Sequence, residues 1–137
     1  MTDDPAFAML DQVIAGRYRI DRLIGKGGAG AVYQATPLGL GRNVAVKLLH
    51  ARTAANDEAR KRFIREARIT SELRHTNAIT VHDFGEHDNQ LFIVMELLTG
   101  RSLRFTIRKR APGLALERAL TLGLQIAEVL KAAHAIP

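Results

Sequence analysis

The residues best suited to chemistry are a cluster of glycines, a lysine and a glutamate that follow one another along the chain. The glycines lie in residues 25–32, whose sequence GKGGAGAV fits the pattern G-x-G-x-x-G-x-V. Because glycine has no Cβ, its backbone can lie close over phosphate oxygens and offer them N–H groups. The pattern indicates a site for nucleotide phosphates, and an ordinary flexible hairpin turn is the simpler alternative.

The surroundings of the glycines exclude two other nucleotide-binding motifs. A dinucleotide fingerprint has a helix directly after its glycines and an acidic residue about 20 positions further on. Here the run at residues 31–35 predicts a strand after the glycines, and the later position carries Lys47. The phosphate-loop pattern G-x-x-x-x-G-K-[ST] does not occur in the sequence.

Lys47 and Glu66 are predicted to form an ion pair. Lys47 lies in the apolar run at residues 44–49, which predicts a strand covered on both sides, where an unpaired ammonium group is costly. Glu66 shares a predicted helical face with Phe63 and Leu73, where a carboxylate also lacks a partner. We therefore expect Lys47 Nζ and a Glu66 oxygen to lie within ~4 Å of each other. A surface pair between Glu66 and an arginine of its own helix is the alternative.

The order of the predicted elements indicates an α+β fold. Strands are expected at residues 17–21, 31–35, 44–49, 79–84 and 91–95, and helices at residues 57–73, 102–110 and 116–135. This order lacks the strict alternation of strand and helix that a doubly wound parallel sheet requires. The first two strands form a hairpin whose turn is the glycine cluster.

Size and composition are typical of one modest globular domain. The 137 residues, of which 47% are hydrophobic and 25% charged, can bury a core without disulfides. With no Cys and five His that show no paired ligand spacing, we expect neither disulfides nor a metal site. No apolar run approaches the ~20 residues of a membrane-spanning helix, so we expect a cytoplasmic location.

The net charge of +6, from 20 basic and 14 acidic residues, allows two interpretations. A basic surface of this kind suits nucleic acid. The sequence has no Trp, however, and its basic residues are spread over predicted helices without interleaved aromatic residues. We interpret them as solvated helix faces and expect no nucleic-acid partner.

The glycine cluster, the segment VAVK that ends at Lys47, Glu66, and the segment IVMELL at residues 93–98 occur in a characteristic order. Together they resemble the N-terminal lobe of a eukaryotic-like serine/threonine protein kinase of the bacterial type. The resemblance implies a five-stranded antiparallel sheet with one main helix, followed by two helices of an incomplete C-lobe. It divides the chain into a leader at residues 1–15, an ATP-binding N-lobe at residues 16–98, and a hinge exit with a partial C-lobe at residues 99–137.

The resemblance also implies a role for each motif. In this family the glycine-rich loop covers the phosphates of ATP, and the strand lysine binds the α- and β-phosphates and pairs with the helix glutamate. A glutamate turned to solvent marks an inactive helix position. The residues that the resemblance places at the nucleotide are Ile24, Gly25, Lys26, Gly27, Gly28, Ala29, Gly30, Val32, Ala45, Lys47, Met95, Glu96 and Leu98.

Within this set, Ile24, Val32 and Ala45 are expected to enclose the adenine ring. Met95 is expected at the rear of the pocket. Glu96 and Leu98 are expected to offer backbone C=O and N–H groups to the adenine edge, which leaves their side chains free to vary.

The same resemblance predicts that these 137 residues do not transfer phosphate on their own. No segment matches H-R-D-x-x-x-x-N, so the catalytic Asp and a Mg²⁺-binding Asn are missing. Asp83-Phe84-Gly85 spells D-F-G but precedes the hinge segment, and we interpret it as a strand end followed by a glycine turn. Mg²⁺ and protein substrates are therefore expected only for the full-length family.

Three interpretations stay open: part of a complete kinase, a non-catalytic kinase-like module that docks on another kinase, and a basic nucleic-acid-binding domain. The helix expected at residues 116–135 is apolar around most of its circumference, which is typical of a helix inside a core. We therefore expect several of its large side chains to face water. Residues 102–137 are then expected to need the missing C-lobe, a kinase partner or self-association.

Overall fold

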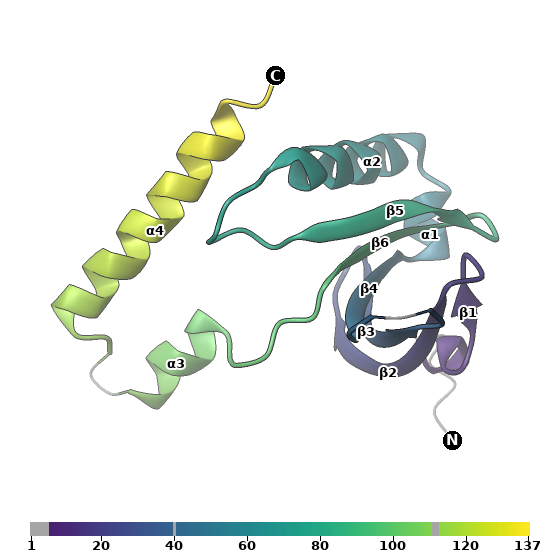
Figure 1. Cartoon of the computed structure of the whole chain (residues 1–137), viewed down its shortest axis with the longest axis horizontal. Helices are drawn as coiled ribbons and strands as arrows, with labels where there is room; N and C mark the ends of the chain where they lie inside the picture. The colour runs from purple at the N-terminus through teal and green to yellow at the C-terminus, as the bar shows by residue number, and fades with distance from the viewer. Residues whose placement is uncertain (1–5, 40, 111–112) are drawn as a thin grey trace.

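The computed structural model describes residues 6–39, 41–110 and 113–137, and its N-terminal part is a curled antiparallel sheet (Figure 1). The strands are β1 (Val13–Ile14), β2 (Tyr18–Lys26), β3 (Gly30–Pro37), β4 (Val44–Leu49), β5 (Val81–His87) and β6 (Gln90–Glu96). Their order across the sheet is β1-β2-β3-β4-β6-β5. After β4 the chain passes through α1 (Ala51–Ala54) and α2 (Asp57–Glu72) to β5 at the far edge, and β6 then returns between β5 and β4. The predicted α+β class is confirmed.

The described residues form six strands instead of the expected five, because the predicted leader contributes β1. This strand pairs in antiparallel register with the start of β2, and Ile14 is buried. A short 3₁₀ helix (Phe7–Met9) precedes it, and the Tyr33 hydroxyl donates a hydrogen bond of 2.9 Å to the Ala6 carbonyl. Ala6 and Ile14 therefore belong to the same core as the rest of the sheet, and Met9, Leu10 and Ala15 pack against it.

Two apolar clusters lie on the two faces of the sheet. The cluster inside the curl is centred on the fully buried side chains of Tyr33, Val46 and Val94. The other cluster lies between the sheet and α2 and consists of Leu49, Phe63, Ala67, Leu91 and Ile93. Successive residues of a strand point to opposite faces, so each strand supplies side chains to both sides.

The buried face of α2 differs from the face that its apolar pattern predicts. Asn56 caps the helix, since its Oδ1 accepts a hydrogen bond of 3.0 Å from the backbone N–H of Ala59. Phe63 and Ala67, one turn apart, are buried, whereas Glu66 is exposed. The prediction that Glu66 lies on the buried face is wrong. Residues three apart on a helix are offset by about 60° around its axis. Glu66 therefore lies to one side of the buried face, which is centred on Phe63 and Ala67.

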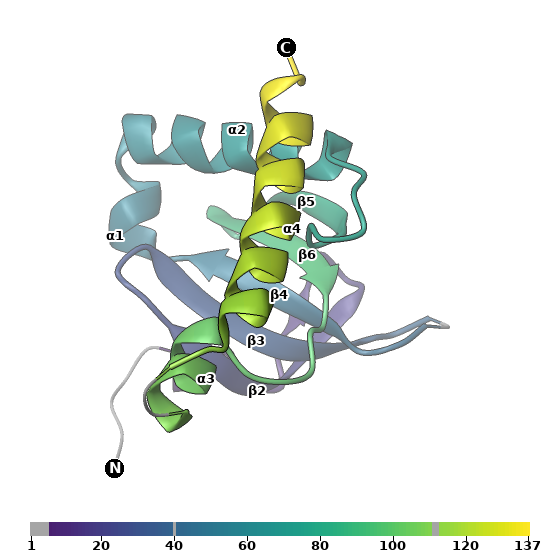
Figure 2. The ribbon, with the colours of Figure 1, turned by 90° about the vertical axis from the view of Figure 1, so that its left-hand side faces the viewer.

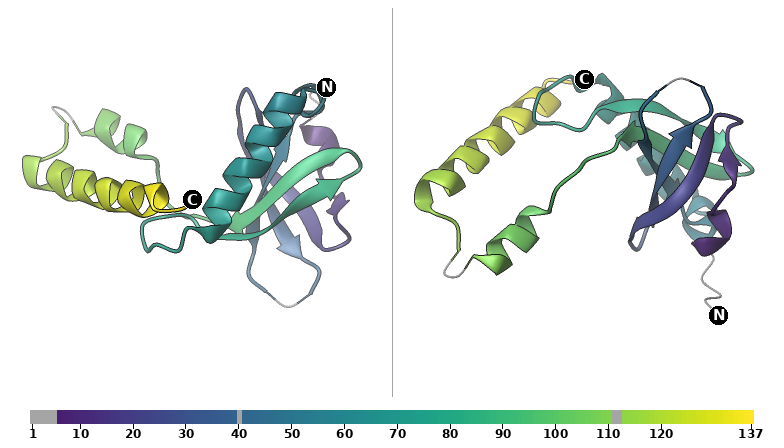
Figure 3. Two further views of the ribbon diagram at one scale, coloured as in Figure 1. Left: turned by 90° about the horizontal axis from the view of Figure 1, so that it is seen from above. Right: turned by 60° about the horizontal axis from the view of Figure 1, so that its bottom comes forward.

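α3 (Leu103–Lys109) and α4 (Leu116–His134) form an arm that projects from the lobe (Figures 1 and 3). When the molecule is viewed from the side that carries α4, this helix crosses the direction of α2 (Figure 2). Neither helix contains a buried residue, and Leu116, Leu120 and Leu124 are 75%, 65% and 62% exposed. The prediction that large side chains of the last helix face water is confirmed. The helices of the described residues lack the combination of length and apolar content needed to cross a membrane.

Candidate nucleotide site

The register of three neighbouring strands brings four of the predicted nucleotide residues onto one face of the sheet. Val32 of β3 lies opposite Lys47 of β4, and Lys47 lies opposite Ile93 of β6. Two residues along β4, Ala45 lies opposite Met95. Directly opposed residues share a face of the sheet. Val32, Ala45, Lys47 and Met95 are therefore neighbours, with the cation beside a patch of small and apolar side chains.

The glycine cluster forms the turn between β2 and β3, as the sequence predicts. The Gly27 N–H donates a hydrogen bond of 2.9 Å to the Gly30 carbonyl and closes the turn. A Cβ on Gly30 would lie only 2.1 Å from the Leu48 carbonyl oxygen of the neighbouring strand, whereas a Cβ on Gly25 or Gly28 would meet open space. The close approach of β3 to β4 is thus the reason that Gly30 must be glycine, and the loop tip keeps an accessible backbone.

Ile24 lies beside this face at the edge of the glycine turn. Leu23 packs against the cluster inside the curl, and Gly25 is paired with Val32. Ile24 is the extra residue of a β-bulge between Leu23 and Gly25, and it is not among the residues that pack against the interior cluster. Its side chain is 45% exposed, so it adds an uncovered apolar surface next to Val32.

The predicted ion pair between Lys47 and Glu66 is not formed, and this expectation is corrected. The ion pairs of the described residues do not include it. Lys47 Nζ instead lies 5.9 Å from the centroid of the Phe63 ring, within reach of a cation–π attraction. Glu66 faces solvent on the neighbouring side of α2. This is the orientation that the kinase resemblance associates with an inactive helix position.

Other contacts hold α2 in this orientation. Phe63 and Ala67 pack against the sheet, and a close ion pair joins Arg60 of α2 to Glu86 near the end of β5. Both anchors lie on the face that turns Glu66 away from Lys47. The sequence pattern missed them because Ala67 carries little weight in an apolar stripe and Glu86 is distant in sequence.

The hinge segment contains an interaction that sequence reasoning missed. A side-chain oxygen of Glu96 accepts a hydrogen bond of 2.7 Å from the Thr80 N–H, and the Glu96 N–H donates one of 2.9 Å to the Thr80 carbonyl. The Glu96 side chain thus joins the hinge to the Thr80 backbone, a contact that the sequence did not predict. Leu98 is 66% exposed, as suits a residue whose backbone alone was expected to matter. The local sequence does not predict the contact between Glu96 and Thr80, because the two residues belong to different segments of the chain.

Asp83-Phe84-Gly85 lies within β5 and has a structural role. Asp83 Oδ2 lies 2.7 Å from the Arg17 guanidinium and accepts a hydrogen bond of 3.1 Å from the Tyr18 hydroxyl. Burial, followed by the hydrogen bond to Asp83, raises the pKa of Tyr18 above its ordinary value of 10.0. The contacts link the edge strand β5 to β2 across the curl. The structural interpretation holds, although the triplet stands inside the strand and not at its end.

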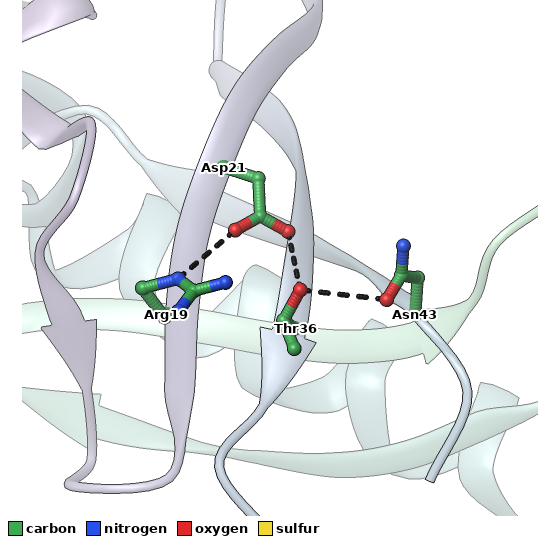
Figure 4. A network of polar contacts seen from close by, with 4 residues as sticks. All are labelled: Arg19, Asp21, Thr36 and Asn43. Carbon is green, nitrogen blue, oxygen red and sulfur yellow. Dashed lines mark hydrogen bonds and ion pairs between the residues drawn. The ribbon is translucent and has the colours of Figure 1, made fainter.

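A second polar network fixes the end of the β2–β3 hairpin that lies away from the glycine turn (Figure 4). Asp21 accepts a hydrogen bond of 3.2 Å from Arg19 Nε and one of 2.6 Å from the Thr36 hydroxyl. The Thr36 oxygen also lies 3.4 Å from Asn43 Oδ1, just before β4. The hairpin is thus anchored at its base, while its glycine tip extends beside the nucleotide face.

Comparison with known proteins agrees with this geometry. The protein kinase domain family matches residues 18–136. The serine/threonine-protein kinase PknE of Mycobacterium bovis is 41% identical over 120 residues, which cover 88% of this chain and 21% of that protein. The serine/threonine-protein kinase PknA of Mycobacterium tuberculosis is 40% identical over 127 residues, which cover 89% of this chain and 29% of that protein.

A solved structure gives the same result for the fold. The PknI kinase domain of Mycobacterium tuberculosis superposes with a TM-score of 0.79 and 34% sequence identity, covering 90% of this chain and 50% of that domain. The chain thus spans half of a solved kinase domain and between a fifth and a third of the curated relatives. The glycine turn, the lysine strand, the helix and the hinge strand all lie in the matched part, and the chain belongs to the protein kinase domain family, of the bacterial serine/threonine type.

Proposed function

We propose that this chain supplies the ATP-binding lobe of a serine/threonine protein kinase. The observation that carries the proposal is the register of β3, β4 and β6, which gathers Val32, Ala45, Lys47 and Met95 on one face beside the glycine turn. An apolar patch next to a cation suits a ligand with a flat apolar ring at one end and phosphates at the other. ATP has this composition.

Each residue then has a defined task. The Lys47 ammonium group binds the α- and β-phosphates, and the backbone N–H groups of residues 25–30 lie over the phosphate chain. Ile24, Val32 and Ala45 enclose the adenine ring. Met95 closes the rear of the pocket. The Glu96 carbonyl and the Leu98 N–H meet the adenine edge, and the hydrogen bonds between Glu96 and Thr80 hold this segment in place.

The full-length reaction that we infer is transfer of the γ-phosphoryl group of ATP to Ser and Thr hydroxyls of protein substrates, with Mg²⁺ neutralising the phosphates. In that reaction α2 must reorient so that Glu66 meets Lys47. The 137 residues contain no H-R-D-x-x-x-x-N segment, so we propose that they bind ATP weakly and transfer no phosphate by themselves.

The test compares ATP binding by the chain with binding by Lys47→Met. Loss of a charged hydrogen bond to phosphate is expected to weaken ATP binding by about 10- to 100-fold, measured by calorimetry or with a fluorescent ATP analogue. Lys61→Met, which removes an exposed lysine of α2, is the matched control and should bind as the unchanged chain does.

Three outcomes contradict the proposal. Equal ATP affinity for Lys47→Met and the unchanged chain removes Lys47 from the site. Incorporation of labelled phosphate into a generic protein substrate, lost in Lys47→Met, shows that the chain is active alone. Strongly salt-dependent binding to DNA with no binding of ATP favours the basic nucleic-acid-binding alternative.

A further inference from the structure

We propose that His50 is a positioning residue for the glycine-rich loop, and that it sets the affinity for the phosphates of a nucleotide. The inference rests on the proposed ATP-binding function and extends it to a residue outside the kinase motifs. His50 follows β4 directly and stands at the corner where the chain enters α1.

His50 holds the tip of the loop at two points. Its ring nitrogen Nε2 lies 3.1 Å from the Gly27 carbonyl oxygen, and its backbone N–H donates a hydrogen bond of 3.0 Å to the Ala29 carbonyl. A carbonyl oxygen only accepts, so Nε2 must carry the proton that forms the first bond. The side chain and the backbone of one residue thus hold two carbonyl groups of the loop, those of Gly27 and Ala29.

The corner that carries His50 is itself well anchored. The His50 carbonyl accepts hydrogen bonds of 2.9 Å from the Thr53 N–H and 2.8 Å from the Ala54 N–H. The preceding residue, Leu49, accepts a hydrogen bond of 3.2 Å from Gln90 Nε2 at the start of β6. The imidazole therefore projects from a fixed part of the sheet to the accessible loop.

The direction of the bond to Gly27 matters for phosphate binding. His50 lines a cavity of about 550 Å³ together with Ala31, Tyr33 and Leu48, which alternate along their strands with the nucleotide-face residues Val32 and Lys47. The Gly27 carbonyl is thus drawn toward the side of the sheet opposite the nucleotide face. In a trans peptide the C=O and the following N–H point in opposite directions.

It follows that the bond to His50 turns the Gly28 N–H toward the nucleotide side. A glycine peptide without this bond rotates easily, because glycine populates both halves of the backbone map. His50 therefore selects the peptide orientation that donates to an anion. The effect concerns phosphate contacts and leaves the adenine contacts of Val32, Ala45 and Met95 unchanged.

The test uses two substitutions that differ in hydrogen-bonding capacity. His50→Phe keeps an aromatic ring without the N–H donor, and His50→Gln keeps an amide N–H that can reach the Gly27 carbonyl. We expect His50→Phe to weaken ATP binding by about three- to tenfold, the size of one net hydrogen bond, and His50→Gln to retain most of the affinity. Adenosine, which has no phosphates, should bind all forms within about twofold. His82→Ala, at an exposed position of β5, is the matched control.

Loop order without nucleotide is the second measurement. The heteronuclear NOE of the Gly27, Gly28 and Ala29 amides should fall in His50→Phe and be retained in His50→Gln. Equal ATP binding by His50→Phe and the unchanged chain overturns the proposal, as does an equal loss for ATP and adenosine. If the unchanged chain binds neither ligand, the proposed ATP-binding function fails; unaltered NOE values in His50→Phe then also refute the anchoring of the loop.

Discussion

At the scale of single residues, several polar side chains join parts of the sheet that are distant in sequence. Asp83 forms an ion pair with the Arg17 guanidinium and accepts a hydrogen bond from the Tyr18 hydroxyl. These contacts join the edge strand β5 to the start of β2. Glu96 and Thr80 make a second such link at the hinge. Asp83 of β5 and Glu96 of β6 thus have structural roles, and their contacts stabilise the sheet that carries the nucleotide face.

The raised pKa of Tyr18 predicts how stability depends on pH. The folded state holds the phenolic proton more tightly than the unfolded state, so this stabilisation is complete below the ordinary pKa of 10.0 and is lost as pH rises from there through the folded-state pKa. We expect the free energy of unfolding, measured with urea, to fall less steeply above pH 10 in Tyr18→Phe than in the unchanged chain. At neutral pH the same substitution should cost about 1 kcal/mol, the value of one hydrogen bond. Parallel pH profiles for the two proteins would show that Tyr18 does not contribute.

At the scale of elements, the orientation of α2 decides whether Lys47 and Glu66 can meet. Apolar packing of Phe63 and Ala67 and the ion pair between Arg60 and Glu86 hold the helix with Glu66 in solvent. Burial of apolar area outweighs an exposed ion pair, which contributes only about 0–1 kcal/mol. In this chain the packing face therefore determines the rotation of the helix.

Two substitutions in α2 should differ strongly in their effect on stability. Glu66→Gln should change the free energy of unfolding by less than about 0.5 kcal/mol, because the side chain is exposed. Phe63→Ala, which removes a buried ring from the same helix, should cost about 3–5 kcal/mol. Chemical denaturation of the two variants tests the difference. A cost above about 2 kcal/mol for Glu66→Gln would mean that the ion pair with Lys47 is formed in solution.

At the scale of the whole molecule, the lobe has its own core and the helical arm does not. Leu116, Leu120, Leu124, Ile126 and Leu130 of α4 are all more than half exposed. Each large apolar side chain left in water forfeits about 1.5–3 kcal/mol relative to burial. Their sum is comparable to the ~5–15 kcal/mol that stabilises a whole domain. We therefore expect the apolar side chains of residues 102–137 to be buried against a C-lobe, a partner protein or a second copy of the chain.

Removal of residues 102–137 should raise solubility while the sheet and α2 stay folded, since both core clusters lie outside the arm. Light scattering reports the association state and amide exchange reports the fold of the lobe. In the intact chain, the double substitution Leu120→Gln and Leu124→Gln should also reduce self-association. A monomeric intact chain that melts cooperatively and protects the amides of α4 would contradict this prediction.

The sequence by itself determined the elements that depend on local pattern. A short continuous apolar run predicts β4, the glycines predict the turn between β2 and β3, and the family motifs name Lys47 and the hinge segment, because apolar pattern and turn chemistry act over a few residues. The sequence alone did not predict the contacts between segments that are distant along the chain. The pairing of Val32 with Lys47, the Tyr18–Asp83 bond and the tether from His50 to Gly27 all depend on strand order and on the curl of the sheet.

Tertiary structure also overruled the sequence in two places. An apolar stripe predicts Glu66 on the buried face of α2, and the packing of Phe63 and Ala67 rotates it into solvent. A short run before Tyr18 lacks a clear strand pattern, and it becomes β1 because the edge of β2 offers it backbone partners and a core for Ile14. In both cases the deciding free energy comes from burial against residues far along the chain, which local sequence does not contain.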